Sequence, residues 1–230
     1  MGHVTVVGGC RAKAPSTGIL ASTLPVGSVV KLMEGGTTVE YLVVNQGIPS
    51  NSSLYDASCD GTWLLRKDIH SERQWNTSNV NAYANSAIHT WLNGDFFNSL
   101  GSVEQSAIKQ VKIPYCVGGE SSTINSAASG LSVKVFLLGD YEVGFSGSNQ
   151  YYPQDSANLD YFIDHDRTAY LNGSTISWWT RSPYTYSTTG AILSSWQPSN
   201  TSNSGGIRPA LVLPKTALFD ETTLQLKGVA

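Results

Sequence analysis

Four carboxylates and a histidine lie close together in the tract QDSANLDYFIDHDR at 154–167. They are Asp155, Asp160, Asp164, His165 and Asp166. Two carboxylates on either side of a sugar can hydrolyse a glycosidic bond, one as general acid and the other as nucleophile or base. A single segment seldom supplies both sides of such a site, and Arg167 offers these carboxylates a charge partner in a solvated turn. The cluster therefore supports two interpretations, a glycan hydrolase or an acidic surface turn.

Metal-binding and nucleophile motifs are absent from the sequence. The aspartate spacing does not match a helix-loop-helix calcium loop, which needs alternate oxygen ligands, a central Gly and a terminal Glu. The histidines lie far apart, without an HxH or HExxH pair, at His3, His70, His89 and His165. No GxSxG motif is present. We predict no metal, no cofactor and no catalytic residue, so that the chain is not an enzyme, and the glycan hydrolase is kept as the alternative.

The three cysteines are Cys10, Cys59 and Cys116, and none belongs to a CxxC pair. An odd number cannot form a closed disulfide framework, so we expect free thiols. A bridge between Cys59 and Cys116 is the alternative, provided that the folded protein leaves the cell and that the two Cα atoms lie close enough.

Charged residues make up only 13% of the chain, and the net charge is −3. A nucleic-acid-binding face requires clustered Lys and Arg, and the 14 basic residues here are spread along the chain, so we expect no nucleic acid partner. No apolar run approaches the length of a membrane span, and the start MGHVTVVGGCRAKAP lacks the pattern of a signal peptide. We therefore expect no direct membrane insertion and no signal peptide.

The stretch 177–214 combines an uncharged polar middle with apolar ends. Between Tyr184 and Ser204, 14 of 21 residues are Tyr, Ser, Thr or Asn, and none is charged. This composition suits a contact surface, because Tyr supplies wide amphipathic area at low entropy cost while Ser and Asn form adaptable hydrogen bonds. A polar surface loop is the other interpretation. The segments on either side supply scaffold residues, namely Trp178, Trp179, Arg181 and Arg208.

We expect both scaffold arginines to be structural, donating to backbone carbonyls or to a buried carboxylate. If both guanidinium groups line an open pocket instead, they are ligand contacts.

The secondary-structure pattern predicts an α+β domain over 23–230, preceded by a flexible arm at 1–22. Strands are predicted at 26–33 and 38–47, joined by a Gly-Gly turn, and at 62–69, 134–144, 176–182, 190–195 and 207–213. A helix is predicted between 79 and 100, with Asn79 or Asn81 as its cap, followed by a second helix at 102–111 that starts at Ser102. Two early helices are therefore followed by short strands.

Three segments together resemble a known family: SAIHTWLNGDFFNSL at 86–100, VKIPYCVGG at 111–119, and WWTRSP at 178–183 followed by GGIRPALVLP at 205–214. They resemble the variable proteins of diversity-generating retroelements in phages and prophages of Gram-positive gut bacteria. The resemblance implies a C-type-lectin-like fold, related to that of the formylglycine-generating enzymes. It also implies a receptor-binding protein of a phage tail or a bacterial cell surface. Its partner is then a protein or glycan on a bacterial cell. The sequence leaves the oligomeric state open, with a homo-oligomer as one alternative.

In that family, errors at adenines diversify the 3′ part of the gene, and Asn codons change most. Such changes yield Tyr, Ser, Thr or Asn but not Trp or Gln, which implies that Trp196 and Gln197 are fixed. The positions implied to be diversified ligand contacts are Tyr184, Thr185, Tyr186, Ser187, Thr188, Ser194, Ser195, Asn200, Ser202 and Asn203. A structural tail module, whose tyrosines face a neighbouring subunit, is the third hypothesis.

Two motifs of related proteins are missing from this sequence, and each removes one function from those that the resemblance implies. The tetrapeptide Gln197-Pro198-Ser199-Asn200 lacks the adjacent acid of calcium-dependent lectins, so calcium-mediated sugar binding is not expected. The formylglycine-generating enzymes use a cysteine pair near the C-terminus, and this chain has no cysteine after Cys116.

Overall fold

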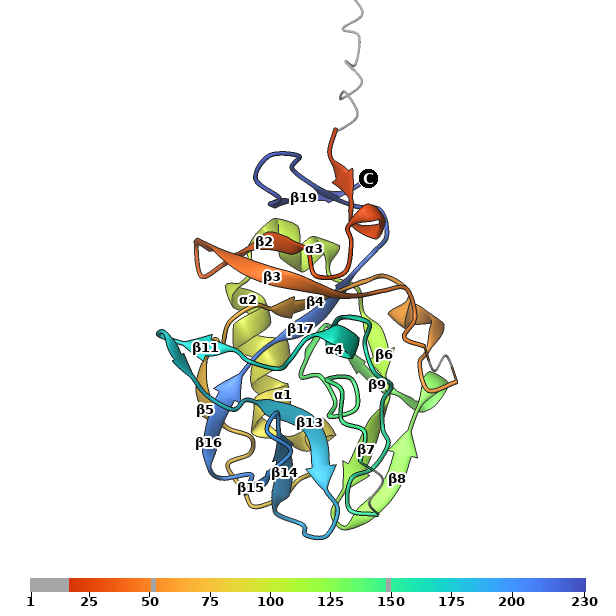
Figure 1. Ribbon diagram of the computed structural model, residues 1–230, viewed down its shortest axis with the longest axis vertical. Coiled ribbons are helices and arrows are strands. Elements are labelled where there is room, and N and C mark those ends of the chain that lie inside the picture. The colour runs from red at the N-terminus through yellow and green to blue at the C-terminus, as the bar shows by residue number, and fades with distance from the viewer. Residues whose placement is uncertain (1–16, 51–52, 148–149) are drawn as a thin grey trace, which may run out of the picture.

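The computed structural model describes residues 17–50, 53–147 and 150–230. The largest sheet in these residues is built from β2 (Val29–Glu34), β3 (Thr37–Gln46), β4 (Thr62–Arg66), β10 (Val135–Phe136) and β17 (Ala210–Leu213). All its pairings are antiparallel, in the order β10–β17–β4–β3–β2. Figure 1 shows this sheet in the upper half of the molecule.

The first hairpin follows directly from its turn residues. Gly35 and Gly36 join β2 to β3 with φ angles of 57° and 79°. A two-residue hairpin turn of this kind needs positive φ at both central positions, which glycine adopts at low cost. The predicted strands at 26–33, 38–47 and 62–69 are confirmed as β2, β3 and β4, with slightly different ends.

Both faces of the large sheet are buried along β4, β17 and the second half of β3, which explains the nearly continuous apolar runs in these strands. Along β4, Leu64 belongs to one hydrophobic cluster, and its neighbours Trp63 and Leu65 belong to the other. The first cluster contains the helical residues Ile88 and Leu92. The second includes residues of the small sheets and loops that follow the helix, such as Val111 and Leu159, together with Tyr55 and Cys59 from the loop before β4. A strand covered on both faces loses the apolar and polar alternation of a half-exposed strand.

The predicted fold class, α+β with two early helices, is wrong. The described residues form mostly short antiparallel strands, with one helical segment of 13 residues. This segment joins α1 (Ala87–Trp91), the π-helical segment η4 (Leu92–Phe96) and α2 (Phe97–Ser99). The other helices are α3 (Ser102–Ala107) and α4 (Tyr161–Asp164). The second helix, predicted at 102–111, is thus limited to the six residues of α3, because a strand begins at Val111.

The N-terminus of the long helical segment is capped by Ser86, whose Oγ accepts a hydrogen bond from the His89 N–H at 3.1 Å. The predicted caps, Asn79 and Asn81, lie outside the helix. Asn81 is buried and bonds to a distant turn instead. The cap predicted at Asn79 or Asn81 is therefore wrong, because the helix begins later, after Ser86.

Six smaller antiparallel sheets complete the described part of the chain. Their strands are β1 (Ile19–Leu20), β5 (Ser71–Gln74), β6 (Val111–Ile113), β7 (Tyr115–Gly118), β8 (Ser121–Asn125), β9 (Leu131–Val133), β11 (Tyr170–Leu171), β12 (Ser174–Thr175), β13 (Trp179–Tyr184), β14 (Gly190–Leu193), β15 (Pro198–Asn200), β16 (Ser204–Ile207), β18 (Ala217–Phe219) and β19 (Leu226–Val229). Single 3-10 turns are η1 (Ala21–Thr23), η2 (Ala57–Cys59), η3 (Tyr83–Asn85) and η5 (Ala127–Ser129). Of the predicted strands, 134–144 is mostly wrong, because only β10 is a strand and 140–144 is a turn.

Different sheets lie at the two ends of the molecule. Strand β1 pairs with β18, and both lie with the C-terminus at the upper end in Figure 1. The sheet of β13, β14 and β15 lies at the lower end. The predicted arm at 1–22 falls mainly outside the described residues, and its last part includes β1. No helix in the described ranges is long and apolar enough to cross a membrane.

Candidate functional site

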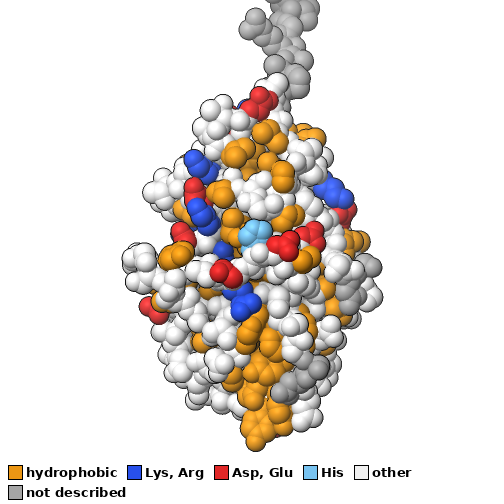
Figure 2. Space-filling view, in the orientation of Figure 1, with side chains coloured by type: hydrophobic (Ala, Val, Ile, Leu, Met, Phe, Trp, Pro, Cys, Tyr) orange, Lys and Arg blue, Asp and Glu red, His pale blue; other side chains and the backbone are white. Residues whose placement is uncertain are grey.

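One end of the molecule carries a cluster of aromatic side chains, which we call the aromatic face. Its members come from the segments 141–152 and 184–196 and are Tyr141, Phe145, Tyr151, Tyr152, Tyr184, Tyr186 and Trp196. Figure 2 shows hydrophobic side chains gathered at the lower end of the molecule, where Figure 1 places β13, while the charged side chains visible on this side lie higher. Grouped exposed apolar side chains of this kind indicate an interaction site.

The rings of the aromatic face contact one another across the two segments. Phe145 stacks on Tyr152 with ring centroids 4.9 Å apart and meets Trp196 at 5.0 Å. Tyr151 meets Tyr186 edge to face at 4.8 Å. Tyr186 is 65% exposed, whereas the other rings are half-buried. The cluster therefore presents a restrained set of rings with one tyrosine projecting from it.

A buried asparagine fixes the turn between β13 and β14, which carries two of these tyrosines. Asn81 is fully buried, and its Nδ2 lies 3.2, 2.8 and 2.8 Å from the carbonyl oxygens of Tyr184, Ser187 and Gly190. Its Oδ1 accepts a hydrogen bond from the Gly119 N–H at 2.7 Å. The side chain amide thus closes the turn from below through main-chain atoms.

Close approach of the β7–β8 turn to Asn81 requires glycine. A Cβ atom at Gly118 would lie 2.3 Å from the Asn81 carbonyl oxygen, and the φ angle there is +75°. Both facts exclude a larger side chain without rearrangement. Gly118 is therefore a packing requirement of the candidate site.

Thr185 joins the two segments of the aromatic face. Its N–H donates to the Tyr151 carbonyl at 3.1 Å, and its Oγ1 donates to the Gln150 carbonyl at 3.1 Å. The Thr185 side chain is buried. Residues 141–152 were not among the residues predicted for the site. The only local signal for them is a set of aromatic residues in a Gly- and Ser-rich sequence.

Both scaffold arginines are buried, at 0% and 2% exposure, so neither guanidinium is open to a ligand. Arg208 donates from Nε to the Arg66 carbonyl and from Nη2 to the Lys67 carbonyl, each at 2.8 Å. Burial lowers the pKa of Arg208 to about 10. The Arg208 guanidinium lies 5.2 Å from the centroid of the Trp178 ring, and the Trp178 and Trp179 side chains are also fully buried.

Arg181 anchors the base of β13 to three other segments. It donates to the Pro114 carbonyl at 2.9 Å and to the Leu137 carbonyl at 3.1 Å, and it pairs with both carboxylate oxygens of Glu142 at 2.5 and 2.7 Å. Glu142 lies in the turn 140–144, which overlaps the start of the aromatic segment 141–152. A bidentate pair of this geometry fixes orientation as well as charge.

Next to this pair lie two further buried carboxylates, Asp140 and Asp155. The Ser182 Oγ lies 3.0 Å from Asp140 Oδ1 and 3.1 Å from both oxygens of Asp155. Asp140 Oδ2 has no hydrogen-bond partner among the described residues. Burial raises the pKa of both carboxyls, and the charge of Asp155 raises that of Asp140 further. The Ser182 hydroxyl has one proton and cannot donate it to both carboxylates. Asp140 and Asp155 therefore favour keeping a carboxyl proton between them.

We expect Asp140→Asn to stabilise the protein at pH 8 relative to the wild type. A carboxyl whose pKa is raised on folding stabilises the folded state below its ordinary pKa, and that contribution is lost as the pH rises toward the folded value. The wild type should therefore lose stability between pH 5 and pH 8 more steeply than the variant, whose amide stays neutral. Urea unfolding at both pH values measures this difference. Equal pH dependence in the two proteins would contradict it.

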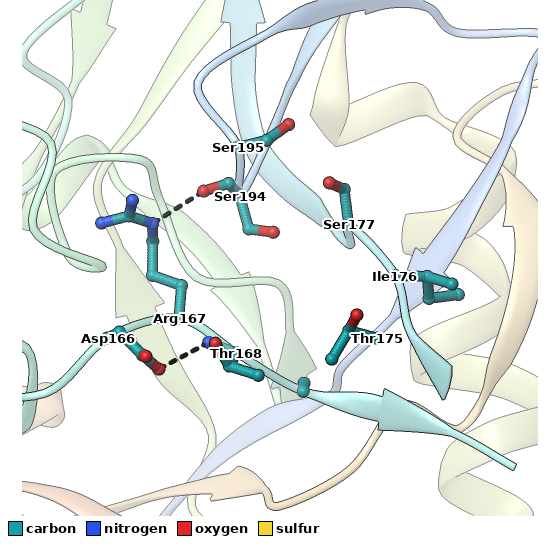
Figure 3. A pocket seen from close by; sticks show the side chains of 9 residues that line it. Asp166, Arg167, Thr168, Thr175, Ile176, Ser177, Ser194 and Ser195 are labelled. Carbon is teal, nitrogen blue, oxygen red and sulfur yellow. Dashed lines mark hydrogen bonds between the residues drawn. The ribbon is translucent and has the colours of Figure 1, made fainter. Parts of the chain in front are cut away.

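A shallow pocket adjoins the aromatic face. It has a volume of about 290 Å³ and is lined by Asp166, Arg167, Thr168, Ala169, Thr175, Ile176, Ser177, Ser194 and Ser195. Figure 3 shows these side chains around the opening, with Arg167 at one side. The Arg167 guanidinium lies 3.8 Å above the Trp196 ring, and its Nε donates to the Ser194 carbonyl at 2.7 Å. Trp196 thus links the pocket to the aromatic face.

The ten positions named as diversified contacts do not all lie on one surface. Tyr184 and Tyr186 belong to the aromatic face, and Ser195 is exposed at the rim of the pocket. The positions Asn200, Ser202 and Asn203 lie on β15 and the following turn. Thr185 and Ser194 are buried, so we leave them out of the contact surface. The remaining positions are the half-buried Ser187 and the exposed Thr188, and Gln197 is also exposed.

The aspartate cluster does not form a catalytic pair. Asp155 is fully buried against Ser182, whereas Asp160, Asp164 and Asp166 are exposed. In the described part of the chain, the pocket that includes Asp166 contains no second carboxylate. The hydrolase interpretation therefore has no geometric support.

The cysteines and histidines give no reactive centre in the described ranges. Cys59 and Cys116 are buried free thiols, and burial raises the pKa of each to about 12. A thiol with so high a pKa is not a nucleophile at neutral pH. No group of three potential metal ligands occurs among the described residues. Cys10 and His3 lie outside those residues.

Residues 60–215 match the protein family described as "Domain of unknown function (DUF6273)". The matched range runs from β4 to the end of β17 and includes both segments of the aromatic face. Comparison with curated proteins and comparison with solved structures found no match. Because the matched range spans more than half of the chain, this protein belongs to the DUF6273 family.

Proposed function

We propose that the chain is a non-catalytic binding domain that contacts a ligand on a bacterial cell through its aromatic face. One observation carries the proposal: Tyr186 is 65% exposed, yet its ring contacts Tyr151 at 4.8 Å on a turn that buried Asn81 holds. An exposed aromatic side chain on a fixed backbone loses little conformational freedom on binding. Such groups supply much of the binding energy of interfaces.

The surroundings of the aromatic face suit binding rather than catalysis. Serine, threonine and asparagine side chains of the 184–204 region supply uncharged hydrogen-bonding groups beside the rings. The buried carboxylates lie beneath the face, where they hold the backbone through Arg181 and Ser182. Apolar and neutral polar side chains therefore lie at the surface of the aromatic face, and charged side chains lie beneath it.

The partner is a protein or a glycan of a bacterial cell, and the chain acts on a phage tail or on a cell surface. The resemblance in three sequence segments supports this part of the proposal, as does the Tyr, Ser, Thr and Asn composition of 184–204.

Replacement of both Tyr184 and Tyr186 by Ala should reduce binding of the fluorescently labelled chain to Gram-positive gut bacteria by about tenfold or more. Flow cytometry over a panel of strains measures it, beginning with strains that bind the wild type. Tyr170→Ala is the matched control, because Tyr170 is 47% exposed on β11 and makes no ring contact with the aromatic face in the described residues. Retained binding by the double variant, or a stable dimer that Tyr186→Ala dissociates, contradicts the proposal and favours a structural module.

A second test concerns diversification by a retroelement. Deep sequencing of this gene in the population that carries it should show changes concentrated at adenine-derived codons of 184–204. The codons of Trp178, Arg181, Arg208 and Trp196 should stay constant. Codons 80–120 are the internal control, and equal variation in the two windows contradicts diversification.

A further inference from the structure

We propose that the ligand of the aromatic face is an acidic glycan, and that Arg167 pairs with its carboxylate or phosphate group. The inference rests on the binding function proposed above and specifies the ligand class. Four features of the structure support it, namely the fixation of Arg167, its unpaired charge, the hydroxyl groups beside it and its position next to the aromatic rings.

Arg167 is held in place by contacts that leave its outer nitrogens unused. Its guanidinium carbon lies 3.8 Å above the Trp196 ring, and Nε donates to the Ser194 carbonyl at 2.7 Å. In the described part of the chain, its two terminal nitrogens have no hydrogen-bond partner. Figure 3 shows them pointing away from Ser194. A guanidinium fixed with two free N–H₂ groups matches the two oxygens of a carboxylate or phosphate.

The charge of Arg167 forms no salt bridge within the described residues, although the neighbouring Asp166 carboxylate interacts with it electrostatically. The nearest acid in sequence, Asp166, accepts a hydrogen bond from the Thr168 N–H at 2.9 Å and forms no ion pair with Arg167. Partial burial lowers the pKa of Arg167, although the group stays charged at neutral pH. A partly desolvated, unpaired cation gains more from an arriving anion than a fully solvated one does.

The pocket beside Arg167 is suited to a sugar ring. It offers hydroxyl groups from four residues, namely Thr168, Thr175, Ser177 and Ser195. Its volume of about 290 Å³ lies at the small end of ligand sites, which fits one monosaccharide. Hydroxyl groups both donate and accept, as sugar hydroxyls do. An acidic peptide would use the guanidinium but has few groups for these hydroxyls, so the pocket favours a glycan.

The position of Trp196 joins this site to the aromatic face. Its ring carries Arg167 and also meets Phe145 at 5.0 Å. A ligand that pairs with Arg167 therefore lies beside the aromatic rings.

The test uses the purified chain and follows arginine Nε–Hε signals by NMR during titration. The probes are D-glucuronate as a carboxylate source, glycerol 3-phosphate as a phosphate source and D-glucose as the neutral control. At least one anionic probe should bind about tenfold or more tightly than glucose. Arg167→Met should remove that preference, and Arg167→Lys should keep part of it. Arg73→Met is the matched control, because Arg73 lies 4.0 Å above the Trp91 ring in the same kind of stack.

The possible outcomes distinguish a carboxylate from a phosphate group and a glycan from an acidic peptide. Binding of one anion only identifies carboxylate or phosphate as the recognised group. Equal affinity for glucose and both anions overturns the proposal, as does unchanged binding by Arg167→Met. Equal Arg167-dependent binding of a hexaglutamate peptide overturns the glycan class. If Arg167→Met does not fold, the wild-type spectrum decides, because the Arg167 signal must shift with the anion while the Arg73 signal does not.

This test can fail independently of the proposed function. If no anion binds while the Tyr184 and Tyr186 double variant still loses cell binding, only the acidic-glycan inference falls. If the double variant binds cells normally, the proposed function falls whatever the probes show.

Discussion

Arg181→Met is expected to lower the free energy of unfolding by about 3–5 kcal/mol. The substitution removes the two hydrogen bonds to Glu142 and leaves that carboxylate buried at 0% exposure without its cation. The carbonyls of Pro114 and Leu137 lose a donor as well. The loss is large because the uncompensated charge cannot reach water, whereas breaking an exposed pair merely rehydrates two ions.

Urea unfolding followed by circular dichroism measures this loss. The matched control is Lys67→Met, which breaks the pair between Lys67 and Glu40, whose side chains are 43% and 46% exposed. That pair should contribute less than about 1 kcal/mol. A double variant with Met at both Arg181 and Glu142 should recover part of the loss, because the charge is then absent. Similar losses for Arg181→Met and Lys67→Met would show that the buried pair is not a main anchor.

Asn81→Ala should lower the free energy of unfolding by about 2–4 kcal/mol, because it leaves several buried main-chain groups without partners. The Gly119 N–H loses its acceptor, and the carbonyls at the β13–β14 turn lose their donor. Urea unfolding gives the stability, and hydrogen exchange at the Gly119 amide reports whether the turn has opened.

Asn79→Ala is the matched control for that experiment, because Asn79 is exposed two residues earlier. A surface substitution of this kind should change stability by no more than about 0.5 kcal/mol. A loss at Asn79 equal to that at Asn81 would mean that the segment, rather than the buried amide, matters.

The parts of the fold that could be predicted from sequence are those whose cause is local. The Gly35-Gly36 turn fixes the first hairpin through its φ angles, and the apolar runs at 41–44 and 62–65 mark strands covered on both faces. The apolar spacing around Ile88 and Leu92 likewise indicates the helical segment. In each case the signal lies within a few residues of the structure that it predicts.

The errors arise where distant residues decide the local structure. Asn81 looks like a helix cap, but its amide bonds to a turn more than 100 residues away. The apolar text at 134–144 indicates a strand, but Glu142 binds Arg181 and draws this segment into a turn. Neither tertiary contact has a local signature.

The candidate site was only partly predicted, because its contacts also join residues that are distant in the sequence. The Tyr-rich segment after β13 was named from its composition, and the ring contacts supply its partners Phe145, Tyr151 and Tyr152. Ring packing between segments some 40 residues apart cannot be inferred from spacing. Asp155 is buried whereas the neighbouring aspartates are exposed, a difference that adjacency in sequence does not reveal.

The anchoring of the β13–β14 turn through carbonyl oxygens has a consequence for its evolution. Every amino acid offers the same carbonyl, so a change of side chain at Tyr184 or Ser187 removes none of the acceptors that Asn81 contacts. Arg181 likewise bonds carbonyls of residues outside the turn. The contacts of Asn81 with this turn therefore do not depend on the side chains of Tyr184 and Ser187, whereas Ser187 and Thr185 add side-chain hydrogen bonds of their own. Exchange of the exposed Tyr186 side chain therefore leaves these hydrogen bonds in place.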